Sequence, residues 1–269
     1  MENHKPLILI TNDDGIYSPG LLAAAEAVSG LGELLPSAPI HQQTGMGRAF
    51  PRMADTGILE PVELQPGRQK IQGFGVHGSP AFSVSYGVLE LAPRKPDLCI
   101  SGINYGENLG TCVSCSGTLG AAFEANSHGI PAIAVSIPMD LSLQRTDDYP
   151  QADWEAAKIV LRHWAQWVLE NGMPAGVDTL NISLPLKPCD PNVCRITTQS
   201  RQNYYEFIRP GRRDFGKPYA LKSEISLHLD TLERDSDIYA VCVDNVVSVT
   251  PMSMLMGAPR NAAALFPEV

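Results

Sequence analysis

The stretch Leu7–Gly20, LILITNDDGIYSPG, determines how the rest of the chain is interpreted. Its first four residues are apolar and predict a buried strand, while Ser18 and Pro19 predict the N-cap and first turn of a helix. Two adjacent carboxylates, Asp13 and Asp14, lie between these elements. Such a strand delivers both acidic side chains to its C-terminal end, where open α/β sheets bind ligands. A plain turn is the alternative interpretation, because Asn, Asp and Gly are typical turn residues.

The composition of the 269-residue chain narrows the function classes. A hydrophobic content of 44% and a charged content of 18% are ordinary for a folded protein with a large core. The formal net charge of −9 disfavours a nucleic-acid backbone or an anionic membrane as the main partner. No apolar run approaches the roughly 18 residues of a membrane span, and Met1–Pro6 lacks the features of a signal peptide. Six scattered cysteines do not resemble a disulfide framework, so we expect a reduced, cytoplasmic protein.

Strand and helix patterns alternate through residues 1–184, and this alternation predicts a Rossmann-like, doubly wound and mostly parallel α/β sheet. A hairpin is expected where two extended runs flank Gln65-Pro-Gly-Arg68. The expected strands are Leu7–Ile10, Glu33–Ala38, Gly57–Leu64, Gln69–Val76, Asp97–Ser101, Ile130–Ser136 and Thr179–Ser183, and the expected helices begin near Ser18, Ser79, Ser116 and Asp153.

The pattern changes after residue 184, where arginines and tyrosines become more frequent. We expect residues 1–184 to form the catalytic core and residues 185–236 to form a β-rich hairpin excursion. Residues 237–269 are expected to return to the core and end in a tail, with a short helix at Asp237–Asp244 and a strand at Val246–Thr250.

Two further loops are expected at the same edge of the sheet as the paired aspartates. The loop Pro39–Gly47 offers the hydroxyl of Thr44 and backbone N–H groups near Gly45, and the loop Gly102–Gly110 offers the amide oxygen of Asn104. Each loop taken alone is equally typical of an ordinary turn. Together they complete an all-oxygen set that suits one Mg²⁺ or Mn²⁺ ion. The predicted ligands are Asp13, Asp14, Thr44 and Asn104.

A phosphate-binding element is predicted at Ser116-Gly117-Thr118, which opens the next helical pattern. The start of a helix offers free backbone N–H groups and the positive end of the helix dipole, and two hydroxyls lie beside them. A phosphate bound there could also contact the metal ion. The alternative is that Ser116 is only a helix N-cap.

The segment Gly73–Gly78, GFGVHG, matches the dinucleotide-binding pattern GxGxxG, and Asp97 follows at about the expected distance. Asp97 would begin its strand, however, whereas the acid that binds ribose ends the following strand. The match also falls in a hairpin arm and not in the first strand-to-helix turn. An NAD(P)-binding oxidoreductase is therefore the weaker alternative function.

A CxxC pair, Cys112 and Cys115, precedes a helix start, where thiol pKa values are often lowered. No apolar strand directly precedes this pair, which disfavours a thioredoxin-like site. Zinc ligation together with Cys189 and Cys194 is also disfavoured, because the spacing of the second pair is longer than in a CxxC motif.

Several motifs together resemble the SurE family of stationary-phase survival proteins, and they follow the family's order through nearly the whole chain. Two further segments, HGSPAFSV from His77 and VVSVTP from Val246, are similar to family segments. The principal motifs are TNDDG with SPG after it, the loop from Ala38-Pro39 to Gly45, SGIN from Ser101, SGT–GAA–EA from Ser116, and GIPAIAVS ending at Ser136.

The resemblance implies a metal-dependent 5′-/3′-nucleotidase whose C-terminal hairpin exchanges between the subunits of a homodimer or homotetramer. By motif position, Asp13 and Asp14 match the metal-binding aspartates and Asn104 matches the metal-binding asparagine. The metal-binding serine of the family falls on Thr44, which retains the hydroxyl. Residues after the Ala-Pro dipeptide and in the arginine-rich C-terminal stretch differ from the family pattern, which leaves the nucleotide preference open.

We therefore expect a divalent-metal-dependent phosphomonoesterase that acts on nucleoside 5′-monophosphates, with 3′-monophosphates as a second substrate class. Asp13, Asp14 and Asn104 are the expected catalytic residues. The competing class is a non-catalytic module that binds a metal ion and a nucleotide as a signal. The expected phosphate-binding residues are Thr44, Gly45, Asn104, Ser116, Gly117 and Thr118.

Overall fold

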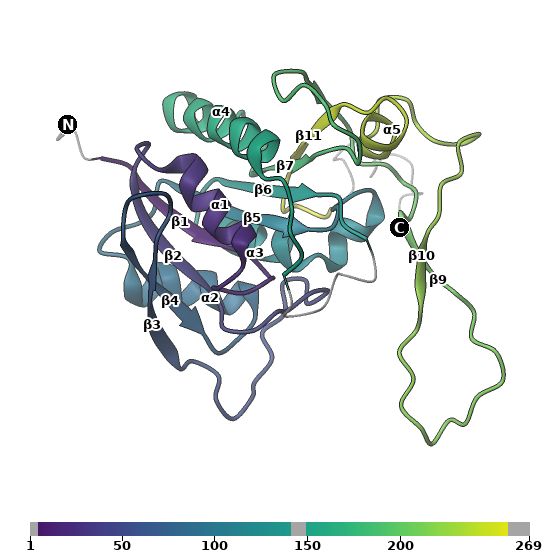
Figure 1. Cartoon of the computed structure of the whole chain (residues 1–269), viewed down its shortest axis with the longest axis horizontal. Helices are drawn as coiled ribbons and strands as arrows, with labels where there is room; N and C mark the ends of the chain where they lie inside the picture. The colour runs from purple at the N-terminus through teal and green to yellow at the C-terminus, as the bar shows by residue number, and fades with distance from the viewer. Residues whose placement is uncertain (1–4, 141–148, 258–269) are drawn as a thin grey trace, which may run out of the picture.

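A computed structural model describes residues 5–140 and 149–257, and its central feature is a mostly parallel sheet covered by helices on both faces (Figure 1). The strands are β1 (Leu7–Thr11), β2 (Glu33–Pro39), β3 (Leu59–Leu64), β4 (Ile71–Val76), β5 (Leu98–Tyr105), β6 (Ala132–Ile137), β7 (Thr179–Ser183), β8 (Cys194–Ile196), β9 (Tyr205–Phe207), β10 (Ser223–Ile225) and β11 (Val247–Met252). The helices are α1 (Pro19–Val28), α2 (Pro80–Tyr86), α3 (Gly117–Ser127), α4 (Glu155–Asn171) and α5 (Asp237–Cys242), with a π-helical turn η1 (Gly87–Leu91) and a 3₁₀ turn η2 (Thr111–Cys115).

The order of the strands places a topological switch point at β1. The described main sheet runs β3-β4-β2-β1-β5-β6-β7-β11-β8, and β1 pairs in parallel with β2 on one side and β5 on the other. The chain first winds outward through β2 and β4, then returns across β1 to continue from β5. In such sheets, a crevice for ligands opens at the carboxyl ends of the strands where winding reverses. The predicted doubly wound α/β fold is confirmed.

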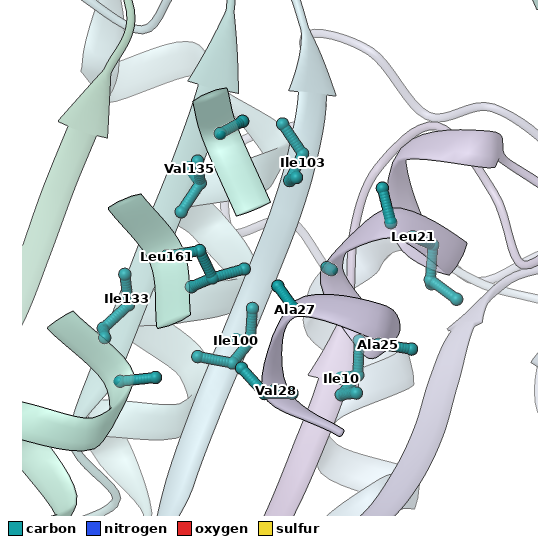
Figure 2. Packing of buried hydrophobic residues seen from close by; sticks show 14 of the residues in the cluster. Ile10, Leu21, Ala25, Ala27, Val28, Ile100, Ile103, Ile133, Val135 and Leu161 are labelled. Carbon is teal, nitrogen blue, oxygen red and sulfur yellow. The ribbon is translucent and has the colours of Figure 1, made fainter. Parts of the chain in front are cut away.

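Alternating side chains of β1 serve the two faces of the sheet. Ile8 and Ile10 join the hydrophobic cluster beneath α1 and α4, whereas Leu7 and Leu9 join the cluster beneath α2 and α3. Figure 2 shows the first cluster, where Leu161 of α4 packs over strands β5 and β6. Each such fully buried aliphatic side chain contributes roughly 1.5–3 kcal/mol to folding, so these two layers hold β1 rigidly.

Serine caps begin four of the described helices, three of them where the sequence predicts a helix start at a serine and the fourth at Ser236 before α5. The Oγ atoms of Ser18, Ser79 and Ser116 accept hydrogen bonds from backbone N–H groups in the first turns of α1, α2 and α3. A cap of this kind stabilises a helix by about 1 kcal/mol. The caps also fix where each helix starts relative to the preceding strand, and two of these starts adjoin the candidate site.

Strand β5 continues four residues beyond its predicted end at Ser101, so the expected loop at Gly102–Gly110 begins too early. Pairing with β6 shifts register between Ser101 and Asn104 and then resumes through Tyr105. Gly102 adopts a φ of +131°, and a Cβ there would overlap the carbonyl oxygen of Val135. The glycine permits this close irregular approach, which breaks the strand pattern in the sequence although the strand itself continues.

The segment after residue 184 divides between the sheet and a projecting hairpin. Strand β8 joins the main sheet beside β11, while β9 and β10 form a separate antiparallel pair that extends away from the body (Figure 1). The predicted return helix and strand are present as α5 and β11. The tail from residue 258 lies outside the described residues, and the proposed domain boundaries remain predictions. In the described part, no helix combines the length and apolarity needed to cross a membrane.

Candidate active site

Asp13 lies just beyond β1 and is held by the start of α3. Its side chain is almost fully buried, and its Oδ1 accepts a 2.5 Å hydrogen bond from the hydroxyl of Thr118. Gly117 makes room for this arrangement, because a Cβ there would lie 2.7 Å from both the Cβ and the Oδ2 of Asp13. The Gly-Thr pair of the SGT motif therefore positions one carboxylate of the candidate site.

Asp14 is held by other parts of the chain than Asp13, namely β5, the loop after β2 and Tyr149. Its Oδ2 accepts a hydrogen bond from the backbone N–H of Tyr105 at 3.2 Å, and its Oδ1 accepts one from Nε2 of Gln42 at 3.3 Å. The hydroxyl of Tyr149 donates to its backbone carbonyl at 3.0 Å. Asp14 thereby connects β1 to the carboxyl ends of β2 and β5, as expected at the switch point.

The two carboxylates form a buried negative pair. Burial raises the pKa of Asp13 to about 6 despite the hydrogen bonds from Thr118. Burial and the neighbouring charge of Asp13 raise the pKa of Asp14 well above its ordinary value. Within residues 5–140 and 149–257, no Lys, Arg or His forms an ion pair with either group. A bound cation would relieve this repulsion directly.

Asn104 and Thr44 supply the remaining oxygen atoms. The side-chain amide of Asn104 donates to the carbonyl of Gly106 at 2.7 Å, which commits its nitrogen and leaves Oδ1 available as a ligand. The loop that carries Thr44 is anchored on both sides, since Gln43 N donates to Asp13 O at 2.6 Å and Gly47 N donates to Cys115 O at 3.0 Å. Backbone groups thus hold both the side chain of Asn104 and the loop that carries Thr44.

A cavity of about 80 Å³ joins these residues at the switch point. It contains five of the predicted site residues, while Asp14, Gly117 and Thr118 lie outside its lining. Carboxylate, amide and hydroxyl oxygens are the donors that Mg²⁺ and Mn²⁺ prefer, so the residues present fit a hard divalent cation. The lining consists of Asp13, Thr44, Gly45, Asn104, Tyr105, Gly106, Glu107, Asn108, Cys112, Cys115, Ser116 and Tyr205.

The three residues of the predicted phosphate-binding element do not all line the cavity. Ser116 lines the cavity, and its Oγ also caps α3 by accepting from Leu119 N at 3.1 Å. The hydroxyl can still donate one hydrogen bond into the cavity. Gly117 and Thr118 instead face Asp13, as described above. Their assignment to phosphate binding remains a prediction, and the structure gives them a direct role in holding the carboxylate.

Glu107 and Tyr205 are part of the cavity wall that the sequence analysis missed. Both oxygens of Glu107 accept phenol hydrogen bonds, from Tyr204 at 3.1 Å and from Tyr205 at 2.8 Å. Burial raises the pKa of Glu107. The sequence marks Glu107 only as a lone acidic residue in the glycine-rich run GENLG. It marks the partners of Glu107 only as an adjacent Tyr-Tyr pair nearly one hundred residues later.

The two cysteines of the CxxC pair contribute to the cavity wall as free thiols. Cys115 Sγ donates to Cys112 O at 3.1 Å, and burial raises the pKa of Cys112. A raised thiol pKa is the opposite of what an activated redox cysteine needs. Cys189 and Cys194 pack against another hydrophobic cluster, and the described residues contain no group of three or more His, Cys, Asp or Glu arranged around a metal ion.

The GxGxxG match lies in the wrong structural context for a dinucleotide. Gly73 and Gly75 are inside β4, which forms the predicted hairpin with β3. A Cβ at Gly75 would lie 2.6 Å from Cδ1 of Ile40, so this glycine allows close packing of the sheet. The first strand-to-helix turn, where a dinucleotide would bind, instead carries the two aspartates.

Comparisons with known proteins agree with this geometry. A family model described as "Survival protein SurE" matches residues 8–206. The 5′-nucleotidase SurE of Methanosarcina mazei is 38% identical over 254 residues, covering 93% of this chain and 92% of the relative. The corresponding protein of Archaeoglobus fulgidus is 38% identical over 255 residues, covering 92% and 91%. The crystal structure of the SurE protein from Aquifex aeolicus matches with a TM-score of 0.73 at 27% identity, covering 97% of this chain and 98% of that chain. This chain therefore belongs to the SurE family.

Proposed function

We propose that this protein is a divalent-metal-dependent phosphomonoesterase that hydrolyses nucleoside 5′-monophosphates to nucleoside and phosphate. The observation that carries the proposal is the buried pair Asp13 and Asp14, which lies at the switch point and forms no ion pair with a Lys, Arg or His among the described residues. The curated relatives bear the name 5′-nucleotidase, which supports this enzyme class. Nucleoside 3′-monophosphates are proposed as a second substrate class.

One Mg²⁺ or Mn²⁺ ion per subunit is the proposed cofactor. Asp13, Asp14, Thr44 and Asn104 would hold it through oxygen atoms, in keeping with the neutral hydrogen-bond donors that surround the carboxylates. When bound, the ion supplies Lewis acidity that polarises a phosphoryl oxygen and lowers the pKa of a nearby water molecule.

The chain's own residues supply orientation and charge stabilisation. Thr118 and Gly117 fix the direction of the Asp13 carboxylate, and the N–H of Tyr105 fixes that of Asp14. The Ser116 hydroxyl and the N-terminus of α3 adjoin the cavity and stabilise negative charge on the phosphoryl oxygens. A carboxylate oxygen of the pair accepts the proton of the attacking water molecule or attacks phosphorus itself; the two routes differ by a covalent intermediate.

Phosphate release from a panel of nucleoside monophosphates and other phosphoesters tests the proposal. Wild-type protein should release phosphate with Mn²⁺ or Mg²⁺, lose this activity in EDTA, and regain it when the metal is restored. Activity that is insensitive to chelation would contradict the metal requirement. Tight nucleotide binding without turnover over hours would favour the non-catalytic signalling module.

We also propose that the β9–β10 hairpin supports a homodimer or homotetramer. Several large apolar side chains on or beside it face solvent in the single chain, among them Phe207 at 66%, Phe215 at 87% and Leu229 at 63% exposure. Such a projecting apolar surface is typical of a subunit interface. Light scattering after size exclusion should report a multiple of 29.1 kDa, and a monomer at micromolar concentration would contradict the assembly.

A further inference from the structure

Glu107 is an unusual component of a cavity that is proposed to take a phosphate. It is 7% exposed, lines the cavity together with Asp13, and has its two oxygens fixed by the hydroxyls of Tyr204 and Tyr205. As far as the described residues define it, the cavity lining contains no Lys, Arg or His. A phosphate would be repelled by this carboxylate, whereas the proposed metal ion would neutralise the charge of Asp13, so we place the phosphate near Asp13 and Ser116.

The Glu107 carboxylate still has acceptor positions that a hydrogen-bond donor of a ligand could use. A carboxylate has about four acceptor positions, and the two phenols use two of them. The remaining positions can accept from a ligand in the cavity but offer nothing to an anion. Tyr205 is itself secured, since its backbone N–H donates to Cys112 Sγ at 3.2 Å. The wall formed by Glu107, Tyr205 and Cys112 is therefore a fixed acceptor surface.

The size of the cavity indicates which part of a nucleotide reaches this surface. At about 80 Å³ it is far smaller than the roughly 300 Å³ or more of sites that enclose a drug-sized ligand. It can take a phosphate and part of the adjoining sugar, while the base remains outside. The donors on that sugar are its hydroxyls, and an acidic side chain that accepts from a ribose hydroxyl is a known mode of nucleotide recognition in α/β folds.

We propose that Glu107 is a specificity-determining residue that accepts a hydrogen bond from the ribose 2′-hydroxyl and so makes the site prefer ribonucleotides over 2′-deoxyribonucleotides. This inference rests on the proposed nucleotidase function and adds a substrate class to it. A hydrogen bond to a charged acceptor corresponds to a preference of about tenfold or more in kcat/KM.

The test is a ratio measured within each variant. The kcat/KM values for AMP and 2′-deoxy-AMP, with Mn²⁺ present, are compared in wild type, Glu107→Gln and the exposed control Glu90→Gln. We expect wild type and Glu90→Gln to share a ribose preference of about tenfold or more, and Glu107→Gln to fall to within about threefold of equality. A general loss of structure would lower both rates together and leave the ratio unchanged.

A second variant and a binding measurement extend this test. Glu107→Asp retains the charge but withdraws the carboxylate by one methylene group, so it should also lose most of the preference and serves if the glutamine variant does not fold. Calorimetric binding of the same two nucleotides gives the ratio where turnover is absent, which separates failure of this inference from failure of the nucleotidase proposal. A wild-type ratio near one, or a ratio that Glu107 substitutions leave unchanged, would overturn the assignment.

Discussion

Gly117→Ala is the substitution that most selectively disturbs the candidate metal site. The added Cβ would lie 2.7 Å from the Asp13 Cβ, whereas ordinary contact begins near 3.4 Å. The side chain of Asp13 must therefore retreat by about 0.7 Å, or α3 must move by the same amount. Displacements above about 0.5 Å already degrade a preorganised site, and a misplacement of about 1 Å can reduce a rate by roughly a hundredfold.

We expect kcat/KM to fall by about 10- to 100-fold in Gly117→Ala, with a smaller effect on stability. Overpacking costs about 1–3 kcal/mol, and the better helix propensity of alanine returns up to about 1 kcal/mol at this first helical position. Net destabilisation of at most about 3 kcal/mol corresponds to a Tm lower by up to about 6 °C. The stability change is thus too small to explain the loss of activity at 25 °C.

Phosphate release, calorimetric Mn²⁺ affinity and thermal unfolding should be measured on Gly117→Ala and on the control Gly211→Ala. Gly211 has no heavy atom near its would-be Cβ and no left-handed φ, so its alanine variant should match wild type in all three assays. Activity within twofold of wild type in Gly117→Ala would refute the reasoning, because the carboxylate could then move without consequence.

Two further predictions concern ion pairs whose members do not line the cavity. Arg48→Ala removes the cation 2.8 Å from the buried carboxylate of Glu124 and should cost about 1 kcal/mol in denaturant unfolding, the upper end for a pair in which Arg48 is 38% exposed. The control Lys70→Ala removes one member of the exposed pair Lys70–Glu63 and should change the free energy of unfolding by less than about 0.5 kcal/mol. Equal losses of stability in the two variants would contradict the argument that burial of Glu124 makes its pair the stronger one. The second prediction concerns pH: hydrogen bonds to Glu60 and then Asp55 raise the pKa of His77. Its stabilisation is complete below its ordinary pKa of about 6.5 and is lost as pH rises through the higher folded-state value. His77→Gln should therefore flatten the fall in Tm between pH 6 and pH 9, and an unchanged slope would exclude this contribution.

The grouping of the proposed metal ligands could be predicted from sequence because it depends on a simple rule of parallel sheets. Carboxyl ends of neighbouring parallel strands meet at one edge, so residues at or just beyond the ends of β1, β2 and β5 converge whatever the details of packing. Asp13, Thr44 and Asn104 do line one cavity, and serine caps also follow directly from local sequence. These features require only the order and type of the elements.

The features that sequence reasoning missed depend on contacts between distant segments. The phenol contacts to Glu107 span 97 and 98 residues, and no local pattern indicates which tyrosines approach which acid. The role of Thr118 in phosphate binding stays a prediction, but the hydrogen bond from its hydroxyl to Asp13, 105 residues away, was not foreseen. The irregular continuation of β5 was hidden because Gly102 interrupts the apolar pattern at the point where the register shifts.

Direct binding of Mn²⁺ to the apoprotein tests the central claim, because it requires no assumption about the substrate. Calorimetry should find one Mn²⁺ site per chain in wild type and in the exposed control Asp214→Asn, displaced by excess Mg²⁺. Asp14→Asn removes one charge of the buried pair and should weaken this binding by at least about tenfold. A wild-type protein that binds no Mn²⁺, or an Asp14→Asn variant with unchanged affinity, would contradict the assignment of a metal ion to the turn after β1.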